Sequence, residues 1–324
     1  MNISIVIPTY QREQVLIQTL EALLPQLVSG DELIVIDQTL VHLRVTEQAL
    51  QHMHDSGEII WIRQLPPSIP CAMNRGLTQA TREIVLFLDD DIEPSPSLIA
   101  SHRRAHQELP NIGAIVGQVL QPGENSGPRK LPRRSRGLNA DMNFPFWSDQ
   151  RTIIQNVMAG NLSVRKELAL AIGGFDERFQ GVAYRFETEF ARRLIQSGHS
   201  VSFEPEASIR HLRAASGGTR AKGSHLTSAS PVYGMGDYYF AMRHGRFVEA
   251  CCYMLRRPIR EVTTRFHLKR PWYIPIKLLG EVRAFLAAFF AWRNGPKLIP
   301  PESTAVFHSK QASSKVFSGF DWKE

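Results

Sequence analysis

The chain has 324 residues, of which 43% are hydrophobic and 21% charged, so it is long enough for one large α/β domain with an appended segment or for two modest domains. Its three cysteines lack metal-ligand spacing, which excludes a cysteine-based metal centre and favours a reducing, cytoplasmic compartment. The opening MNISIVIPTY has no basic stretch before a long apolar run, and we expect it to form a strand and not a signal peptide.

The formal charge of +7 and the pI of about 9.5 are compatible with nucleic acid, anionic lipid or a phosphorylated substrate as partner. The charge is regional, since residues 251–297 hold ten Lys and Arg against two Asp and Glu, and a second basic run extends from Arg129 to Arg136. The best candidate for a membrane span, Leu278 to Trp292, is too short and contains Glu281 and Arg283. We therefore expect no transmembrane helix, while a helix lying in a membrane surface stays open.

The first ninety residues alternate between short apolar runs, which are typical of strands, and segments with helical periodicity. Strands are expected at 3–8, 33–36, 59–62 and 84–88, with helices at 12–27, 43–54 and 72–80. Continuously apolar strands separated by helices form parallel sheets covered on both faces, and such sheets bind ligands beyond the carboxyl ends of their strands. Asp37 and the triplet Asp89 to Asp91 fall at strand ends of that kind.

The alternation continues, with helices expected at 97–108, 166–172 and 187–197 and strands at 112–120, 157–164 and 201–203. Pro205 and His211 follow the last of these strands. Residues 214–230 are rich in Gly, Ser, Ala and Thr, which indicates a flexible linker. Residues 231–300 are expected to be helical, aromatic and basic, and residues 301–324 to form a polar tail.

The acidic triplet in FLDDDIEP presents hard oxygen ligands to a hard cation. Mg²⁺ and Mn²⁺ prefer carboxylates and normally share their coordination shell with substrate phosphates. Three adjacent acids repel one another unless something offsets their charge, and a divalent ion bridging a diphosphate does so. The alternative is a solvated acidic turn. The position of the triplet after the apolar strand Ile84 to Leu88 favours a ligand site.

Six segments, taken in order, resemble family 2 glycosyltransferases of the GT-A fold. The opening SIVIPTYQR, the VID at 35–37, the AMNRG at 72–76 and FLDDD resemble the nucleotide-binding half of that family. NLSVRKELALAIGGFDERF (161–179) resembles its acceptor-side stretch, and FETEFARRLIQSGHSVSFEPEASIRHL (186–212) its catalytic helix, strand and metal-histidine segment. The resemblance covers residues 1–213. It implies a Rossmann-like, mostly parallel central sheet flanked by helices, here with a helical C-terminal extension.

The resemblance assigns donor contacts to residues near the strand ends, namely Pro8, Thr9, Tyr10, Arg12, Asp37, Asn74, Asp89 and Asp90. The loop from Pro8 to Arg12 would surround the nucleobase and ribose, and Asp37 would accept hydrogen bonds from the base. Asn74 lies in the segment that closes over the nucleotide, and Asp89 would contact the ribose or the donor sugar.

The same resemblance assigns the metal ligands. Asp91 would bind a divalent cation, Mn²⁺ or Mg²⁺. His211 would supply another metal ligand or a contact to the diphosphate, a role that a neutral imidazole fills. The structural alternative for His211 is a surface histidine that follows a strand.

The chain departs from the family pattern at the start of the catalytic helix. The family has Glu-Asp where this chain has Phe186-Glu187, so Glu187 falls at the position of the usual Asp. An inverting transferase needs a carboxylate that takes the proton from the acceptor hydroxyl as it attacks the anomeric carbon. We assign that role to Glu187, with Glu189 as the alternative. Acids at a helix N-terminus are also favoured by the macrodipole without any catalytic role.

The basic and aromatic region after residue 231 fits three roles: a platform on an anionic membrane surface, a packing layer for the catalytic domain, or a nucleic-acid site. No nucleic-acid motif accompanies the charge, so nucleic acid is not an expected partner. With the first role, the protein would be cytoplasmic and peripheral on the inner face of the cell membrane.

The sequence thus predicts a metal-dependent inverting glycosyltransferase. It would move a sugar from a nucleotide-sugar donor to a hydroxyl of a cell-surface polysaccharide, a lipopolysaccharide or a lipid-linked acceptor. One alternative is a catalytically impaired, membrane-associated scaffold derived from a transferase, which the altered Phe186-Glu187 pair keeps open. The other is a nucleotidyltransferase, but the segment PTYQRE lacks the Gly-rich, Lys-containing loop that such enzymes carry after the first strand.

Overall fold

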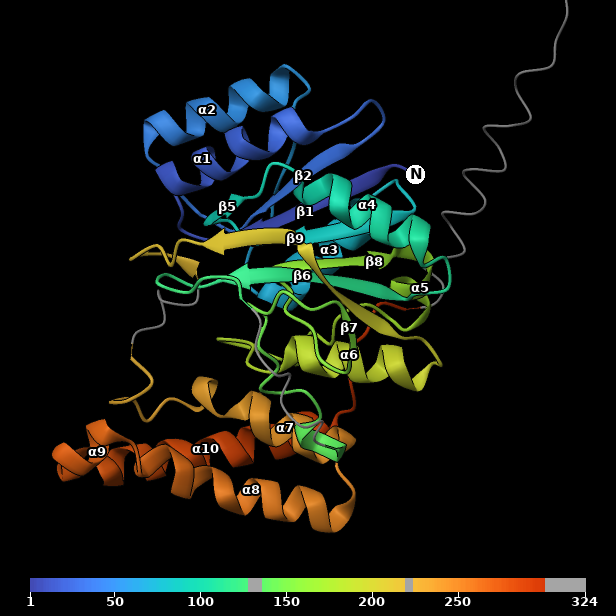
Figure 1. Ribbon diagram of the computed structural model, residues 1–324. Helices are drawn as coiled ribbons and strands as arrows, with labels where there is room; N and C mark the ends of the chain where they lie inside the picture. The colour runs from blue at the N-terminus through green and yellow to red at the C-terminus, as the bar shows by residue number, and fades with distance from the viewer. Residues whose placement is uncertain (128–135, 219–223, 301–324) are drawn as a thin grey trace, which may run out of the picture.

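The structure, a computed structural model, describes residues 1–127, 136–218 and 224–300 of the chain. Most of the basic run that begins at Arg129 and the whole expected tail from residue 301 therefore lie outside the described residues. A nine-stranded sheet crosses the molecule with helices on both faces, and a further layer of helices lies beneath it (Figure 1). This arrangement confirms the predicted α/β fold class with a helical C-terminal region.

The strands are β1 (Ile3–Thr9), β2 (Glu32–Asp37), β3 (Ile60–Arg63), β4 (Ile84–Leu88), β5 (Ile92–Pro94), β6 (Ala114–Leu120), β7 (Thr152–Ile154), β8 (Asn161–Arg165) and β9 (Val201–His211). The helices around the sheet are α1 (Gln14–Leu23), α2 (Arg44–Asp55), α3 (Ile69–Gln79), α4 (Leu98–Glu108), α5 (Lys166–Ala171) and α6 (Phe186–Gln196). The helical layer consists of α7 (Met235–His244), α8 (Phe247–Val262), α9 (Arg265–Lys269) and α10 (Ile274–Arg293). Short 3₁₀ helices are η1 (Leu24–Gln26), η2 (Gly137–Asn139), η4 (Pro231–Tyr233) and η5 (Pro271–Tyr273).

The sheet has the strand order β3-β2-β1-β4-β8-β6-β9-β5, with β7 paired to β9. The first four strands are parallel, so their carboxyl ends lie at one edge. β8 runs antiparallel to both β4 and β6, and β6 runs parallel to β9. Consequently β6 and β9 also end at the edge where β1 and β4 end. The reversed strand β8 brings its first residue to the same edge.

The strand at β9 is much longer than the expected 201–203. It continues through Pro205 to His211, and its pairing with β6 shifts register between Gly117 and Gln118. Proline lacks a backbone N–H and is tolerated in a sheet where the ladder is irregular. We expected the strand to stop because of Pro205, but the irregularity accommodates this residue, and the strand carries His211 to the ligand edge.

Other differences from the expected elements are small. β8 begins at Asn161 and not at 157, because the Asn161 N–H closes a turn on the Met158 carbonyl at 3.1 Å. β5 and β7 are three residues long each and were not expected, since so short a strand has no detectable period.

The catalytic-side core is aromatic. Phe175 packs edge-on against Phe87 of β4, with ring centroids 5.3 Å apart, and stacks on Phe190 of α6 at 4.4 Å. All three rings are fully buried. Burial of such rings is a large stabilising contribution, and here it fixes α6 against the sheet.

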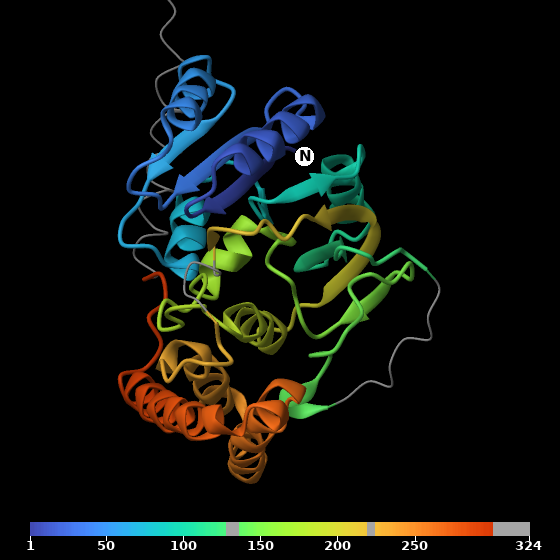
Figure 2. The ribbon, with the colours of Figure 1, turned by 90° about the vertical axis from the view of Figure 1, so that its left-hand side faces the viewer.

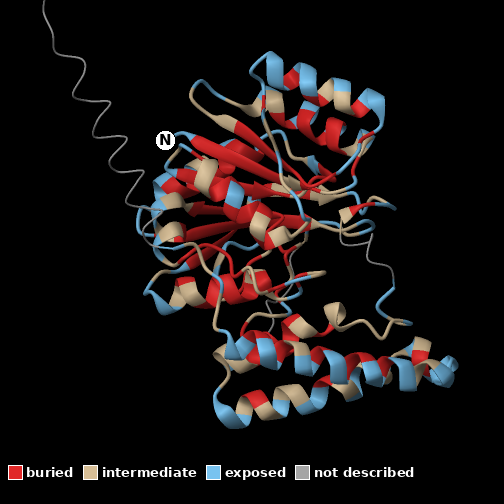
Figure 3. Cartoon of the chain, turned by 180° about the vertical axis from the view of Figure 1, so that it is seen from behind, coloured by how far each residue is buried: buried red, intermediate tan, exposed pale blue. Residues whose placement is uncertain are grey.

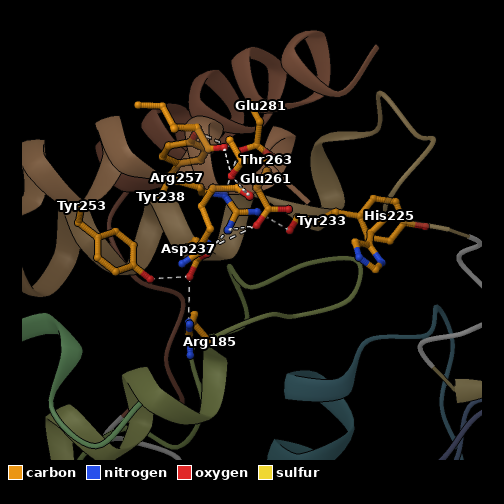
Figure 4. A network of polar contacts seen from close by, with 12 residues as sticks. Arg185, His225, Tyr233, Asp237, Tyr238, Tyr253, Arg257, Glu261, Thr263 and Glu281 are labelled. Carbon is orange, nitrogen blue, oxygen red and sulfur yellow. Dashed lines mark hydrogen bonds and ion pairs between the residues drawn. The ribbon is translucent and has the colours of Figure 1, made fainter. Parts of the chain in front are cut away.

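The helical layer is joined to the sheet domain through α7, which packs between α6 and α10 (Figure 2). At its centre Asp237, fully buried, accepts hydrogen bonds from Arg185 Nε at 2.9 Å and from the Tyr253 hydroxyl at 2.8 Å, and it forms an ion pair with Arg257 (Figure 4). Burial alone would raise the pKa of Asp237, but Arg257 and Arg185 outweigh it and hold that pKa below its usual value. None of the helices described in residues 1–300 is long and apolar enough to cross a membrane.

Loss of the Asp237 charge should destabilise the protein strongly. Asp237→Asn leaves the buried Arg257 without its main counter-charge, and breaking such a pair costs about 3–5 kcal/mol of unfolding free energy. Urea denaturation followed by circular dichroism measures it. The matched control is Asp149→Asn, an exposed acid, for which we expect a change within about 0.5 kcal/mol. Equal midpoints for the two variants would contradict the role of Asp237.

Candidate functional site

A pocket of about 420 Å³ lies at the edge where β1, β4, β6 and β9 end. Nine of the twelve residues that the sequence nominated line it: Pro8, Thr9, Tyr10, Arg12, Asp89, Asp90, Asp91, Glu187 and His211. They come from four separate stretches of the chain, and the strand topology described above brings them together. Asp37, Asn74 and Glu189 are not among the lining residues.

The pairing of β5 with β9 places the acidic triplet beside the histidine. Ile92 is the Cα partner of His211, so the residue before Ile92 lies next to the imidazole. Asp91 Oδ1 is 3.0 Å from His211 Nε2. The other carboxylate oxygen accepts from the Ala214 N–H at 2.8 Å and from the Arg12 guanidinium at 3.2 Å. Burial would raise the pKa of Asp91, but the hydrogen bond and the charge of His211 hold it below its usual value.

The three acids of the triplet occupy three environments. Asp90 is buried and paired with Arg12 Nε at 3.1 Å. Burial raises the pKa of Asp90 to about 6, although Arg12 favours the charged form. The side chain of Asp89 is 48% exposed and lines the pocket, with one oxygen 4.0 Å from His211 Nε2. Asp89 and Asp91 therefore present carboxylate oxygens near the imidazole, while Asp90 is held away by Arg12.

Gly160 provides the space that Asp89 occupies. A Cβ at Gly160 would lie 2.1 Å from Asp89 Oδ2, so no other residue fits without moving the carboxylate. The two residues are brought together because β8 is antiparallel to β4, with Asn161 opposite Leu88, and the Asp89 N–H bonds to the Gly160 carbonyl at 3.2 Å.

Glu187 projects into the pocket from the first turn of α6. Burial raises the pKa of Glu187 to about 7, while the hydrogen bond from the Ala159 N–H, at 2.7 Å, favours the charged form. The helix begins after Arg185, a non-glycine residue in the left-handed conformation with φ of 74°. Such a backbone is held only where its surroundings fix it. Here Arg185 is fixed by its ion pair with Asp237 of the helical layer.

Glu189 lies on another side of α6 from Glu187 and faces the protein interior. It is fully buried and binds Arg193 at 2.8 Å and His244 at 3.3 Å. Burial would raise the pKa of Glu189, but hydrogen bonds from His244 and Arg193 keep it below its usual value. Of the two acids considered as the base, the structure brings only Glu187 to the pocket.

Asp37 is fully buried, and both of its oxygens accept hydrogen bonds from the protein. His42 Nε2 lies 2.9 Å and Trp61 Nε1 3.0 Å from Oδ2, and the Thr39 N–H donates to Oδ1 at 2.8 Å. Burial would raise the pKa of Asp37, but the hydrogen bond and charge of His42 hold it low. Asp37 thus has protein donors on both oxygens, and its contact with a nucleobase stays a prediction.

Asn74 connects α3 to the segment after α5. Its amide donates to the Phe175 carbonyl at 2.8 Å and accepts from the Phe175 N–H at 2.7 Å. A second donor hydrogen bond reaches Glu177 at 3.1 Å. This paired contact with the backbone N–H and carbonyl of one residue, Phe175, fixes the GGFDE stretch beside α3.

Sequence reasoning missed the return of residues 214–218 to the site. Arg12 donates to the carbonyls of Ala214 and Ser216, and the Gly218 N–H donates to the Tyr10 carbonyl at 2.7 Å. Gly217 has φ of +79°, and a Cβ there would lie 2.2 Å from the Gln11 carbonyl oxygen. The Gly217-Gly218 pair was the available indication, because glycine permits close backbone approach as well as a linker.

The donor set fits a divalent metal that takes part of its shell from substrate. Asp91, Asp89 and His211 offer carboxylate oxygen and imidazole nitrogen, which suit Mn²⁺ and Mg²⁺. Within the described residues, no three His, Cys, Asp or Glu side chains are already grouped as a complete metal site. A divalent metal that shares its shell with substrate phosphates and water needs only one or two carboxylate ligands from the protein.

Comparisons with known proteins agree with this geometry. A sequence model described as glycosyl transferase family 2 matches residues 4–170, about half of the chain. An uncharacterized protein of Sinorhizobium fredii, y4gI, is 25% identical over 67% of this chain. The matched part covers only a quarter of that relative's length. A glucosyl-dolichyl phosphate glucuronosyltransferase of Haloferax volcanii is 20% identical over 65% of this chain and 69% of the relative.

The crystal structure of GalNAc-T7 with UDP, GalNAc and Mn²⁺ has a TM-score of 0.56 and 14% identity over 75% of this chain and 50% of that one, which shows the shared fold. From the ordered motifs, this GT-A fold and the family match, the chain belongs to the family 2 glycosyltransferases.

Proposed function

We propose that this chain is a metal-dependent inverting glycosyltransferase that uses a nucleotide-sugar donor. The observation that carries the proposal is the placement of Glu187 in one pocket with Asp89, Asp91 and His211. Inversion by single displacement needs a base on the acceptor side and charge stabilisation on the leaving-group side. This pocket has a carboxylate at one wall and acid and imidazole groups at the other.

Glu187 would act as the base. As the acceptor hydroxyl attacks the anomeric carbon of the donor, the Glu187 carboxylate takes its proton, and the nucleoside diphosphate leaves with the electrons of the broken bond. A base works best when its pKa lies near the working pH. Burial raises the pKa of Glu187 to about 7, which fits that requirement. The presence of this acid in the pocket argues against the scaffold alternative.

Asp91 and His211 would hold the divalent metal, with Asp89 beside them facing the donor. The metal, when bound, supplies positive charge for the leaving diphosphate. The Arg12 guanidinium, which lies against Asp90 and Asp91, keeps both carboxylates oriented at the wall of the pocket. The GalNAc-T7 structure of the same fold holds UDP and Mn²⁺.

For the acceptor we propose a saccharide hydroxyl, either in a polysaccharide or on a lipid-linked carrier. The Haloferax relative bears the name of a transferase acting on glucosyl-dolichyl phosphate, a lipid-linked sugar.

Asp91→Asn should weaken nucleoside diphosphate binding in the presence of Mn²⁺ by at least about tenfold, because it removes a charged ligand. Calorimetric titration of UDP, GDP and dTDP, with and without Mn²⁺, measures the effect and identifies the preferred base. Affinity equal to that of the wild type would remove Asp91 from the metal site. Circular dichroism checks that the variant is folded.

Glu187→Gln should bind the donor normally but lose at least about a hundredfold in transfer rate, since the amide cannot accept the proton. Release of the nucleoside diphosphate with an acceptor present is the readout. Glu167→Gln, an exposed acid on α5, is the matched control and should transfer at the wild-type rate. Retained turnover in Glu187→Gln would place the base elsewhere.

The rate of transfer should rise with pH through the neutral range. The pKa of Glu187 is raised to about 7, so the carboxylate is largely protonated below that pH and cannot act as base. At saturating donor and metal we expect the rate to fall about tenfold per pH unit below the pKa and to level off above it. Glu187→Asp keeps a carboxylate on a side chain that is one methylene shorter, so its rate should still fall at low pH, with a shifted midpoint. A rate that does not change with pH in the wild type would contradict the assignment.

A further inference from the structure

Helix α10 has its large apolar side chains on the outside. Its buried residues are mostly small or charged, namely Lys277, Gly280, Glu281, Ala284, Ala288 and Ala291. Leu278, Val282, Phe285, Phe289 and Trp292 follow one another at intervals of four and three and are all exposed. That spacing places them in one stripe along the helix. A helix in a soluble domain normally has the reverse arrangement.

Further exposed apolar residues of the same helix broaden the stripe on one side. Leu279, Leu286 and Phe290 are 54%, 48% and 59% exposed on the same helix. Just before it, Leu268 and Trp272 are more than half exposed. Figure 3 shows the molecule from behind, the side on which α10 lies, with exposed residues along the length of the lower helices. We call the exposed side chains of residues 265–293 the α9–α10 face.

Charged groups stabilise the inner side of α10 in place of an apolar core. Glu281 accepts from Arg257 Nε and from the Tyr238 hydroxyl, each at 2.9 Å (Figure 4). Lys277 lies 3.3 Å from Glu281 and 3.1 Å from Glu261. Because these ion pairs are buried and satisfied, the helix is fixed in this orientation. The buried ion pairs therefore direct the apolar stripe toward the outside of the molecule, and the stripe is not part of the core.

The charge on the α9–α10 face has one sign. Arg265, Lys269, Arg270, Arg283 and Arg293 are exposed. The single acid between residues 265 and 293 is Glu281, which is buried. Basic side chains around exposed Leu, Phe and Trp are the pattern of a helix that lies in the headgroup region of an anionic bilayer.

We propose that the α9–α10 face binds an anionic lipid surface, with α10 lying in the plane of the membrane. A second copy of the chain is a poorer occupant, because two such faces would bring like charges together with no exposed acid between residues 265 and 293 to offset them. Contiguous exposed apolar patches of this kind mark interaction sites in soluble proteins.

The α9 end of the layer lies on the side of the molecule toward which β6 and β9 point (Figure 1). Those strands end at the pocket. A chain seated on lipid through α10 would therefore hold its pocket close to the membrane surface, within reach of an acceptor attached to lipid. This step rests on the proposed function, whereas binding to lipid does not.

Vesicle flotation tests the proposal with the full chain and no donor. We expect binding to vesicles of phosphatidylcholine mixed with phosphatidylglycerol, little binding to phosphatidylcholine alone, and weakening at high salt. Leu286→Glu with Phe290→Glu should lower the partition coefficient by more than about tenfold, because two apolar anchors are lost. Val41→Glu with Val45→Glu adds the same charge at exposed apolar positions outside the face and should bind as the wild type does.

Equal binding by both double variants, or equal binding to neutral and anionic vesicles, would overturn the proposal. The proposal would also be overturned if the chain did not bind vesicles and light scattering showed a dimer instead. In that case the Leu286→Glu with Phe290→Glu variant would be a monomer. Donor hydrolysis in solution separates the two proposals, since the Leu286→Glu with Phe290→Glu variant should hydrolyse donor at the wild-type rate. Matching thermal unfolding midpoints show that both double variants are folded.

Discussion

Asp91 connects its own segment to two others that are distant in the sequence, Arg12 and residues 211–214. It accepts from Arg12 after β1, His211 at the end of β9 and the Ala214 N–H beyond it, while its own backbone carbonyl accepts from the Leu212 N–H at 2.8 Å. Among side chains, only a carboxylate has two oxygens that can accept all three of these donors. The mouth of the pocket depends on this one group, whether or not a metal shares it.

A second buried carboxylate, Asp237, organises the opposite wall. It pairs with Arg185, the residue in the left-handed conformation from which α6 begins, and Glu187 follows two residues later. The helical layer therefore has a structural connection to the proposed base, in addition to its outward-facing surface. Both walls of the site are positioned by acids that have no direct part in the proposed chemistry at the anomeric carbon.

Much of this arrangement was predictable from sequence. The strands that end at Asp37 and Asp89 were evident because apolar runs of that length have a clear pattern. The role of His211 at the pocket edge followed only from family resemblance, since Pro205 argued against a strand reaching it, and the register shift beside Gly117 is not visible in a periodicity. The contact between Glu189 and Arg193 is an i,i+4 pair that helical spacing allows. Nothing in the local sequence, however, shows that His244 joins this pair while Glu187 faces the pocket. The sequence predicts that residues 231–300 are helical, aromatic and basic. It does not predict that the apolar stripe of α10 faces outward, because the orientation of the helix depends on which of its faces forms the buried ion pairs.

The dependence of Arg185 on Asp237 limits how the two halves of this chain can diverge. Here the counter-charge for a residue at the start of the catalytic helix comes from the appended layer. A chain that exchanged its helical layer for another would have to supply a new carboxylate at that point or replace Arg185 itself. The boundary near residue 231 thus separates two kinds of secondary structure, but charged contacts cross it. Arg185–Asp237 and Glu189–His244 both link the two parts, so the two parts cannot be inherited independently.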